Sequence, residues 1–137
     1  MEAPKWAQDL VVNAILFVNP DAPLPEIRWR RGSAHSSSGN SKPEYITITA
    51  GIARRDAKLV LLHELAHWLL PRIKKTYGRG KWQREFIVCQ GHTDEFWDLA
   101  WSLYRWAKLP VAYCKQREFT YKAGAKKAYL RSRKEKV

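Results

Sequence analysis

The chain has 137 residues, enough for one hydrophobic core but not for two. Its 25 Lys and Arg against 13 Asp and Glu give a net charge of +12, which favours a polyanionic partner, nucleic acid before an acidic membrane surface. No stretch approaches the roughly 20 apolar residues of a membrane span, and the N-terminus lacks a signal-peptide pattern, so we expect a soluble, cytoplasmic protein. We also expect it to be a monomer.

The first half of the chain predicts one helix and two strands. Residues 4–18 carry an apolar helical pattern that stops before Asn19 and Pro20. Residues 27–30 and 45–49 alternate as short half-buried strands, which we expect to pair antiparallel across a Ser/Gly/Asn-rich loop at 32–43. His35 in that loop is expected to be solvated, with a role in substrate binding or catalysis as the alternative.

Residues 63–67 read His-Glu-Leu-Ala-His, the H-E-x-x-H pattern, within the apolar stretch 59–70. Histidines four apart on a helix project from one face, so His63 and His67 can converge on one Zn²⁺ while Glu64 acts as general base. The apolar surroundings predict a helix in the core, ending before Pro71. The alternative is a helix whose core histidines are merely hydrogen-bonded. A metal and its water would satisfy all three buried polar side chains, which otherwise cost about 1 to 3 kcal/mol each.

The metal needs a third protein ligand, because catalytic zinc commonly takes three side chains and one water. His92 is the candidate, since it lies far enough along the chain to return against the motif helix. Asp94 and Glu95 are rivals, but helix capping also explains them. Thr93 is the expected N-cap of a helix that runs to about residue 108.

Basic residues mark two further segments. Residues 72–84 predict a basic surface excursion around Tyr77. Residues 115–137 hold nine basic and two acidic side chains, a net +7, interleaved with aromatics. This composition suits single-stranded or distorted nucleic acid, although a solvated helix face or disordered end is the alternative. The candidate contacts are Lys115, Arg117, Lys122, Lys126, Lys127, Arg131 and Arg133.

The strand at 45–49, the motif helix and the segment Gly-His-Thr-Asp-Glu-Phe-Trp at 91–97 resemble the SprT-like and Spartan group of zinc metallopeptidases. This resemblance covers roughly residues 45–108. It implies that His63, His67 and His92 bind one Zn²⁺ and that Glu64 is the catalytic base. It also implies a compact, gluzincin-like α+β domain at residues 1–110, followed by a basic extension at 111–137. With only Cys89 and Cys114, the chain lacks a four-cysteine ribbon, so it looks like a minimal form whose free thiols are expected to be buried.

These residues predict a metallopeptidase in which a zinc-activated water attacks a peptide carbonyl and Glu64 takes its proton, on proteins associated with nucleic acid. The strand at 45–49 is expected to offer its edge to an extended peptide, and Tyr77 and Tyr104 are candidate oxyanion donors. The alternatives are a non-enzymatic nucleic-acid-binding protein with structural zinc, and a zinc hydrolase acting on another bond.

Overall fold

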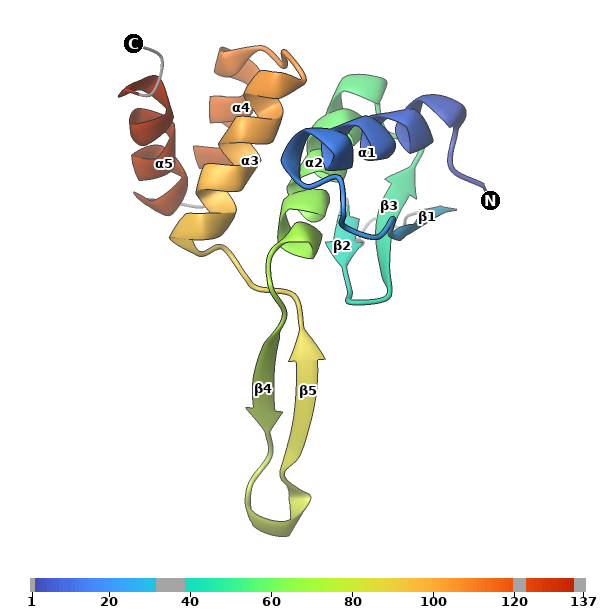
Figure 1. Ribbon diagram of the computed structural model, residues 1–137, viewed down its shortest axis with the longest axis vertical. Helices are drawn as coiled ribbons and strands as arrows, with labels where there is room; N and C mark the ends of the chain where they lie inside the picture. The colour runs from blue at the N-terminus through green and yellow to red at the C-terminus, as the bar shows by residue number, and fades with distance from the viewer. Residues whose placement is uncertain (1, 32–38, 120–122, 135–137) are drawn as a thin grey trace.

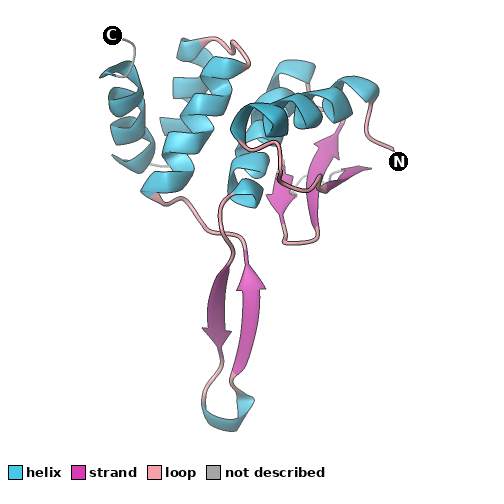
Figure 2. Ribbon diagram, in the orientation of Figure 1, coloured by secondary structure: helices cyan, strands magenta, loops and turns pink. Residues whose placement is uncertain are grey.

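The computed structural model describes residues 2–31, 39–119 and 123–134, which form an α+β fold with five α-helices and two small sheets (Figure 1, Figure 2). This confirms the predicted class. The helices are α1 (Lys5–Val18), α2 (Arg54–Leu69), α3 (Asp94–Trp106), α4 (Val111–Glu118) and α5 (Ala123–Lys134).

The first three helices begin and end close to the predicted positions, because their signals are local. Thr93 caps α3 as predicted: its hydroxyl accepts a hydrogen bond from the Phe96 backbone N–H at 3.2 Å. Asp94 and Glu95 lie in the first turn, where acidic side chains face the positive end of the helix dipole.

The first sheet has the strand order β1-β3-β2, and the predicted antiparallel pairing of its two longer strands is wrong. β1 (Glu26–Arg31) runs parallel to β3 (Tyr45–Ala50), and the short β2 (Gly39–Ser41) pairs antiparallel with β3 on the other side. β2 lies inside the predicted loop, so the chain reverses direction twice between β1 and β3. Two reversals restore the original direction, which makes β1 and β3 parallel. His35 lies outside the described residues.

The basic excursion at 72–84 belongs to a β-hairpin. β4 (Ile73–Tyr77) pairs antiparallel with β5 (Arg84–Val88), from Ile73 opposite Val88 to Tyr77 opposite Arg84. A 3₁₀ turn, η1 (Gly80–Trp82), lies at its tip. Figure 1 shows the hairpin projecting well away from the packed helices. Because nearly every residue of both strands is exposed, their sequence lacks the alternation of a half-buried sheet.

Helix α2 lies at the centre of the core. All residues from Leu59 to Trp68 are buried, with Leu61, Leu62 and Leu65 fully so. In Figure 1, α1 and the three-stranded sheet flank α2 on one side and α3 flanks it on the other. Full burial of each large apolar side chain contributes about 1.5 to 3 kcal/mol, so this helix anchors the domain.

The C-terminal helices contribute to the same core. Ala125 and Ala128 of α5 are completely buried, and Cys114 of α4 is 1% exposed. The Trp101 indole N–H of α3 donates to the Ala125 carbonyl at 3.0 Å. The described part of the basic segment is thus a packed pair of helices. Both cysteines are free, as predicted; Cys114 is buried, whereas Cys89 is only half-buried.

Among the described residues, no helix combines the length and apolar character that crossing a bilayer requires.

Candidate metal centre

Three histidines converge where α2 meets the start of α3. His63 and His67 lie one turn apart on α2, and His92 lies two residues before Asp94, the first residue of α3. One ring nitrogen from each lies within 4.8 Å of the other two, so the three could hold a metal ion. Asp94 and Glu95, the rival ligands, are exposed and do not belong to this cluster.

One of the three nitrogen–nitrogen distances matches the spacing expected around a tetrahedral ion. His63 Nε2 and His92 Nε2 are 3.2 Å apart. Two nitrogens that each lie 2.0 to 2.1 Å from a tetrahedral zinc are about 3.3 to 3.4 Å apart. Three imidazoles also suit copper, iron or nickel, so the donor set fits a transition metal without specifying which.

Hydrogen bonds fix which nitrogen of each motif histidine faces the cluster. His67 Nδ1 lies 2.6 Å from the Gln90 carbonyl oxygen, which can only accept, so Nδ1 carries the proton and Nε2 keeps its lone pair. His63 Nδ1 lies 3.0 Å from Glu118 Oε1, and we assign the same tautomer there. Both motif histidines therefore have the outer hydrogen bond that orients metal-ligating imidazoles in proteins.

Glu118, at the end of α4, was not singled out as a functional residue from the sequence. Its side chain is 1% exposed, and Oε1 also accepts a hydrogen bond from the Tyr104 hydroxyl at 2.6 Å. Burial and the neighbouring Glu118 carboxylate raise the pKa of Tyr104 well above its ordinary value, which keeps this hydroxyl protonated. Tyr104, a candidate oxyanion donor, therefore donates within the core instead. The sequence carried no signal for this pairing because Glu118 lies 55 positions beyond His63.

Aromatic rings from α3 hold the imidazoles in place. Phe96 stacks on His67 with ring centroids 4.0 Å apart, and Trp97 stacks on His92 at 5.3 Å. Both aromatic side chains are almost completely buried. The apolar wall also affects protonation: burial, together with repulsion from His63 whenever that ring is protonated, lowers the pKa of His67 to about 3 and lowers that of His92, although His92 is the exposed member of the cluster. Neutral imidazoles are the form that binds metal.

Glu64 lies beside the cluster on α2 and is 9% exposed. Burial raises its pKa, while a protonated His63 and a hydrogen bond from Ser41 would each lower it. Ser41 is the last residue of β2, so the sheet contacts the residue that the motif predicts to be the base. A carboxylate with a raised pKa at such a position suits proton transfer near neutral pH.

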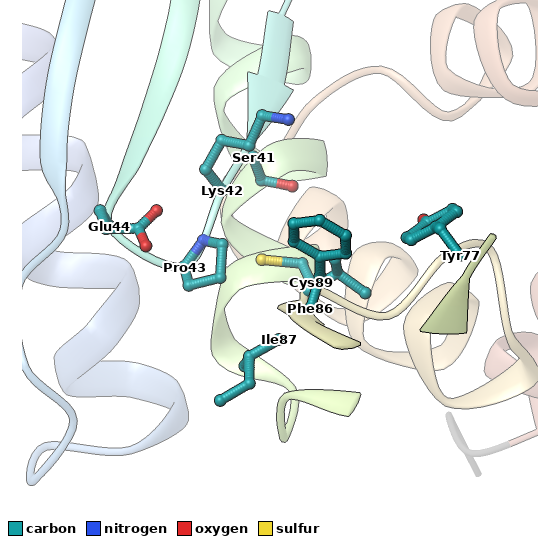
Figure 3. Close-up of a pocket in the computed structure, with 9 residues that line it drawn as sticks. Ser41, Lys42, Pro43, Glu44, Tyr77, Phe86, Ile87 and Cys89 are labelled. Carbon is teal, nitrogen blue, oxygen red and sulfur yellow. The ribbon is translucent and has the colours of Figure 1, made fainter. Parts of the chain in front are cut away.

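A groove of about 410 Å³ lies between the turn after β2 and the strands of the hairpin. Figure 3 shows Ser41, Lys42 and Pro43 on one side, with Tyr77, Phe86 and Cys89 across from them. Ser41 lines this groove and also bonds to Glu64, whereas Glu64 and the three histidines are not among the residues that line it. Tyr77, the second candidate oxyanion donor, lies on its hairpin side.

The candidate nucleic-acid contacts of the C-terminal segment are dispersed over two packed helices. Arg131 pairs with Asp98 of α3 at 2.7 Å, and Lys115 lies 4.8 Å from the centre of the Tyr129 ring. Arg133 and Lys126 lie within 6 Å of Tyr129 and Phe119 respectively. Arg117 and Lys127 are exposed, and Lys122 lies outside the described residues.

No protein-family model matches the chain, and no curated protein or solved structure is detectably similar to it. The resemblance to SprT-like metallopeptidases therefore stays a prediction. The function has to be inferred from the site itself.

Proposed function

We propose that this chain is a zinc-dependent metallopeptidase that hydrolyses peptide bonds in proteins associated with nucleic acid. The observation that carries the proposal is the convergence of His63, His67 and His92 beside the buried Glu64. Three neutral imidazoles form a common catalytic zinc set that leaves one position open. The H-E-x-x-H pattern favours peptide over phosphodiester hydrolysis, because nucleases more often use carboxylate-rich or two-metal sites.

In this proposal the histidines hold the metal and Glu64 moves the proton. When bound, zinc would act as a Lewis acid that polarises a carbonyl and lowers the pKa of water toward neutral pH. Glu64 accepts a proton from the attacking water as its oxygen bonds to the peptide carbonyl carbon. It returns that proton to the leaving amine as the carbon–nitrogen bond breaks, so no other acid is needed.

The sheet topology changes the expected mode of peptide binding. The strand at 45–49 cannot offer an edge, because β3 is central and pairs with β1 and β2. Within the described residues, β2 pairs only with β3, so its other edge is available for an added strand. An extended peptide on β2 would pass Ser41, enter the groove and approach Glu64.

The test is cleavage of protein mixtures, with and without DNA, by zinc-loaded wild type and Glu64→Gln. Glutamine keeps the shape of the side chain but cannot take the proton, so we expect cleavage to fall at least about 100-fold. The histidine ligands are unchanged, so the zinc content should stay near one per chain.

Glu95→Gln is the matched control, since it removes the same charge from an exposed carboxylate outside the cluster. It should cleave like the wild type. Equal cleavage by wild type and Glu64→Gln would contradict the proposal. A zinc-loaded protein that binds DNA but cleaves nothing would instead support a structural metal.

A further inference from the structure

The tip of the β4–β5 hairpin, residues 78–84, presents cations and one large aromatic at the end of the projecting arm (Figure 1). Arg79, Lys81 and Arg84 are exposed, and the seven residues include no acid. Trp82 is 70% exposed. Because most of this large side chain stays in water, a partner that covers it would gain the free energy of burying its apolar surface.

The tip is a defined turn. Gly78 adopts φ +87°, and a Cβ at this position would lie 2.5 Å from the Trp82 carbonyl oxygen. The backbone N–H of Trp82 donates to the Arg79 carbonyl at 3.1 Å, and the Arg84 side chain donates to the Gln83 carbonyl at 3.0 Å. These contacts order the backbone around Trp82, so less backbone entropy is lost when the tip binds a partner.

The C-terminal helices have a similar composition but do not present their aromatics in this way. Phe119 and Tyr129 are half-buried and pack around Trp101, with ring centroids 6.3 and 5.2 Å from it. Several nearby cations face these rings or an acid, and at the tip Lys81 likewise lies 5.3 Å from the centre of the Trp82 ring, so the difference lies in the exposure of the aromatic side chain. Among the large hydrophobic side chains that the structure describes, Trp82 has the highest exposed fraction, and its neighbours in the tip include three cations.

We propose that the hairpin tip binds single-stranded nucleic acid, with Trp82 stacked on a base and Arg79, Lys81 and Arg84 contacting phosphates. Residues 73–88 carry five basic side chains and one acid, a net +4 that complements a phosphate backbone. A membrane-inserting tip would gather apolar residues at its apex, whereas Phe86 lies at the middle of this hairpin and Ile87 nearer its base. This inference rests on the nucleic-acid part of the proposed function and is independent of peptide hydrolysis.

The test measures binding of the full chain to labelled oligothymidylate and oligouridylate of about twenty nucleotides, with fluorescence anisotropy of the label as the readout. Trp82→Ala should weaken binding about tenfold or more, and Trp82→Phe should retain part of the affinity because it can still stack. The double variant Arg79→Ala/Lys81→Ala should reduce the slope of log affinity against log salt by about 1.4.

Lys126→Ala/Lys127→Ala is the matched control, because it removes two exposed positive charges from α5. It should weaken binding less than the hairpin double variant. Equal effects of the two double variants, or a change of less than twofold in Trp82→Ala, would overturn the proposal. So would vesicles of anionic lipid that bind through Trp82 while the oligonucleotides do not.

The cleavage assay separates this proposal from the proposed enzyme. Loss of oligonucleotide binding in Trp82→Ala with unchanged cleavage of a protein substrate without DNA supports a separate binding surface. A wild type that binds no oligonucleotide would overturn the tip proposal and the nucleic-acid part of the function, and would leave the peptidase intact.

Discussion

Replacing Glu118 by glutamine tests whether a residue from the C-terminal helices sets the affinity of the metal centre. In the native protein, Glu118 Oε1 accepts hydrogen bonds from His63 Nδ1 at 3.0 Å and from the Tyr104 hydroxyl at 2.6 Å. Glutamine keeps the size of the side chain and one acceptor oxygen. It removes the negative charge that strengthens His63 as a donor to the metal.

The expected loss is about 10- to 100-fold in zinc affinity, which equals about 1.4 to 2.8 kcal/mol. Glu118→Ala is a poorer test, because it strands the His63 N–H and the Tyr104 hydroxyl in the core at about 1 to 3 kcal/mol each. Such a variant would lose stability and metal affinity together. The glutamine variant separates the two effects.

Zinc affinity is measured by competition with a chromogenic chelator, and the imidazole tautomers by nitrogen-15 NMR of the histidine rings. Tyr104→Phe is the matched control: it removes the hydroxyl's hydrogen bond to Glu118 and its longer 3.4 Å contact with His63 Nδ1, and it preserves the contact between Glu118 and His63. We expect it to bind zinc within a few-fold of wild type. If Glu118→Gln binds zinc within twofold of wild type with unchanged tautomers, the orienting role is refuted.

Two further predictions concern stability. Burial lowers the pKa of His67 from 6.5 in the unfolded chain to about 3 in the folded protein. Between these two pH values the unfolded chain binds a proton on His67 that the folded protein does not. The contribution of this group to the stability of the metal-free protein is therefore complete above pH 6.5 and is lost toward pH 3, by at most about 1.4 kcal/mol per pH unit. Urea unfolding of the metal-free protein checks this, and an unchanged pH slope in His67→Gln would count against it. Gly78→Ala should loosen the hairpin tip, since its positive φ and the nearby Trp82 carbonyl oppose a Cβ, and faster hydrogen exchange across residues 73–88 would reveal it. Gly80→Ala shares the positive-φ cost, at φ +57°, but its added Cβ has no atom within 4 Å, so it should change exchange less; equal exchange in the two variants would contradict the steric reasoning.

Much of the helical framework and the three histidines of the cluster could be predicted from the sequence because their signals are local. The four-residue spacing of His63 and His67 fixes their common face on a helix. Thr93 specifies the start of α3, and so places His92 just before it. Apolar patterns over residues 4–18 and 59–70 predicted α1 and α2 in the same way.

Tertiary structure decided what depends on pairing between distant segments. The direction of β1 relative to β3 follows from an extra reversal at β2, which three residues with little apolar character did not predict. The hairpin has no buried face, so its strands left no alternating pattern to detect. In the sequence, Glu118 is one of two acids in a segment with nine basic residues. In the structure, α4 places its carboxylate 3.0 Å from His63 Nδ1. The sequence by itself therefore determined the candidate ligands, whereas only the fold decided which side chains orient them, because orientation depends on contacts across 55 residues of chain.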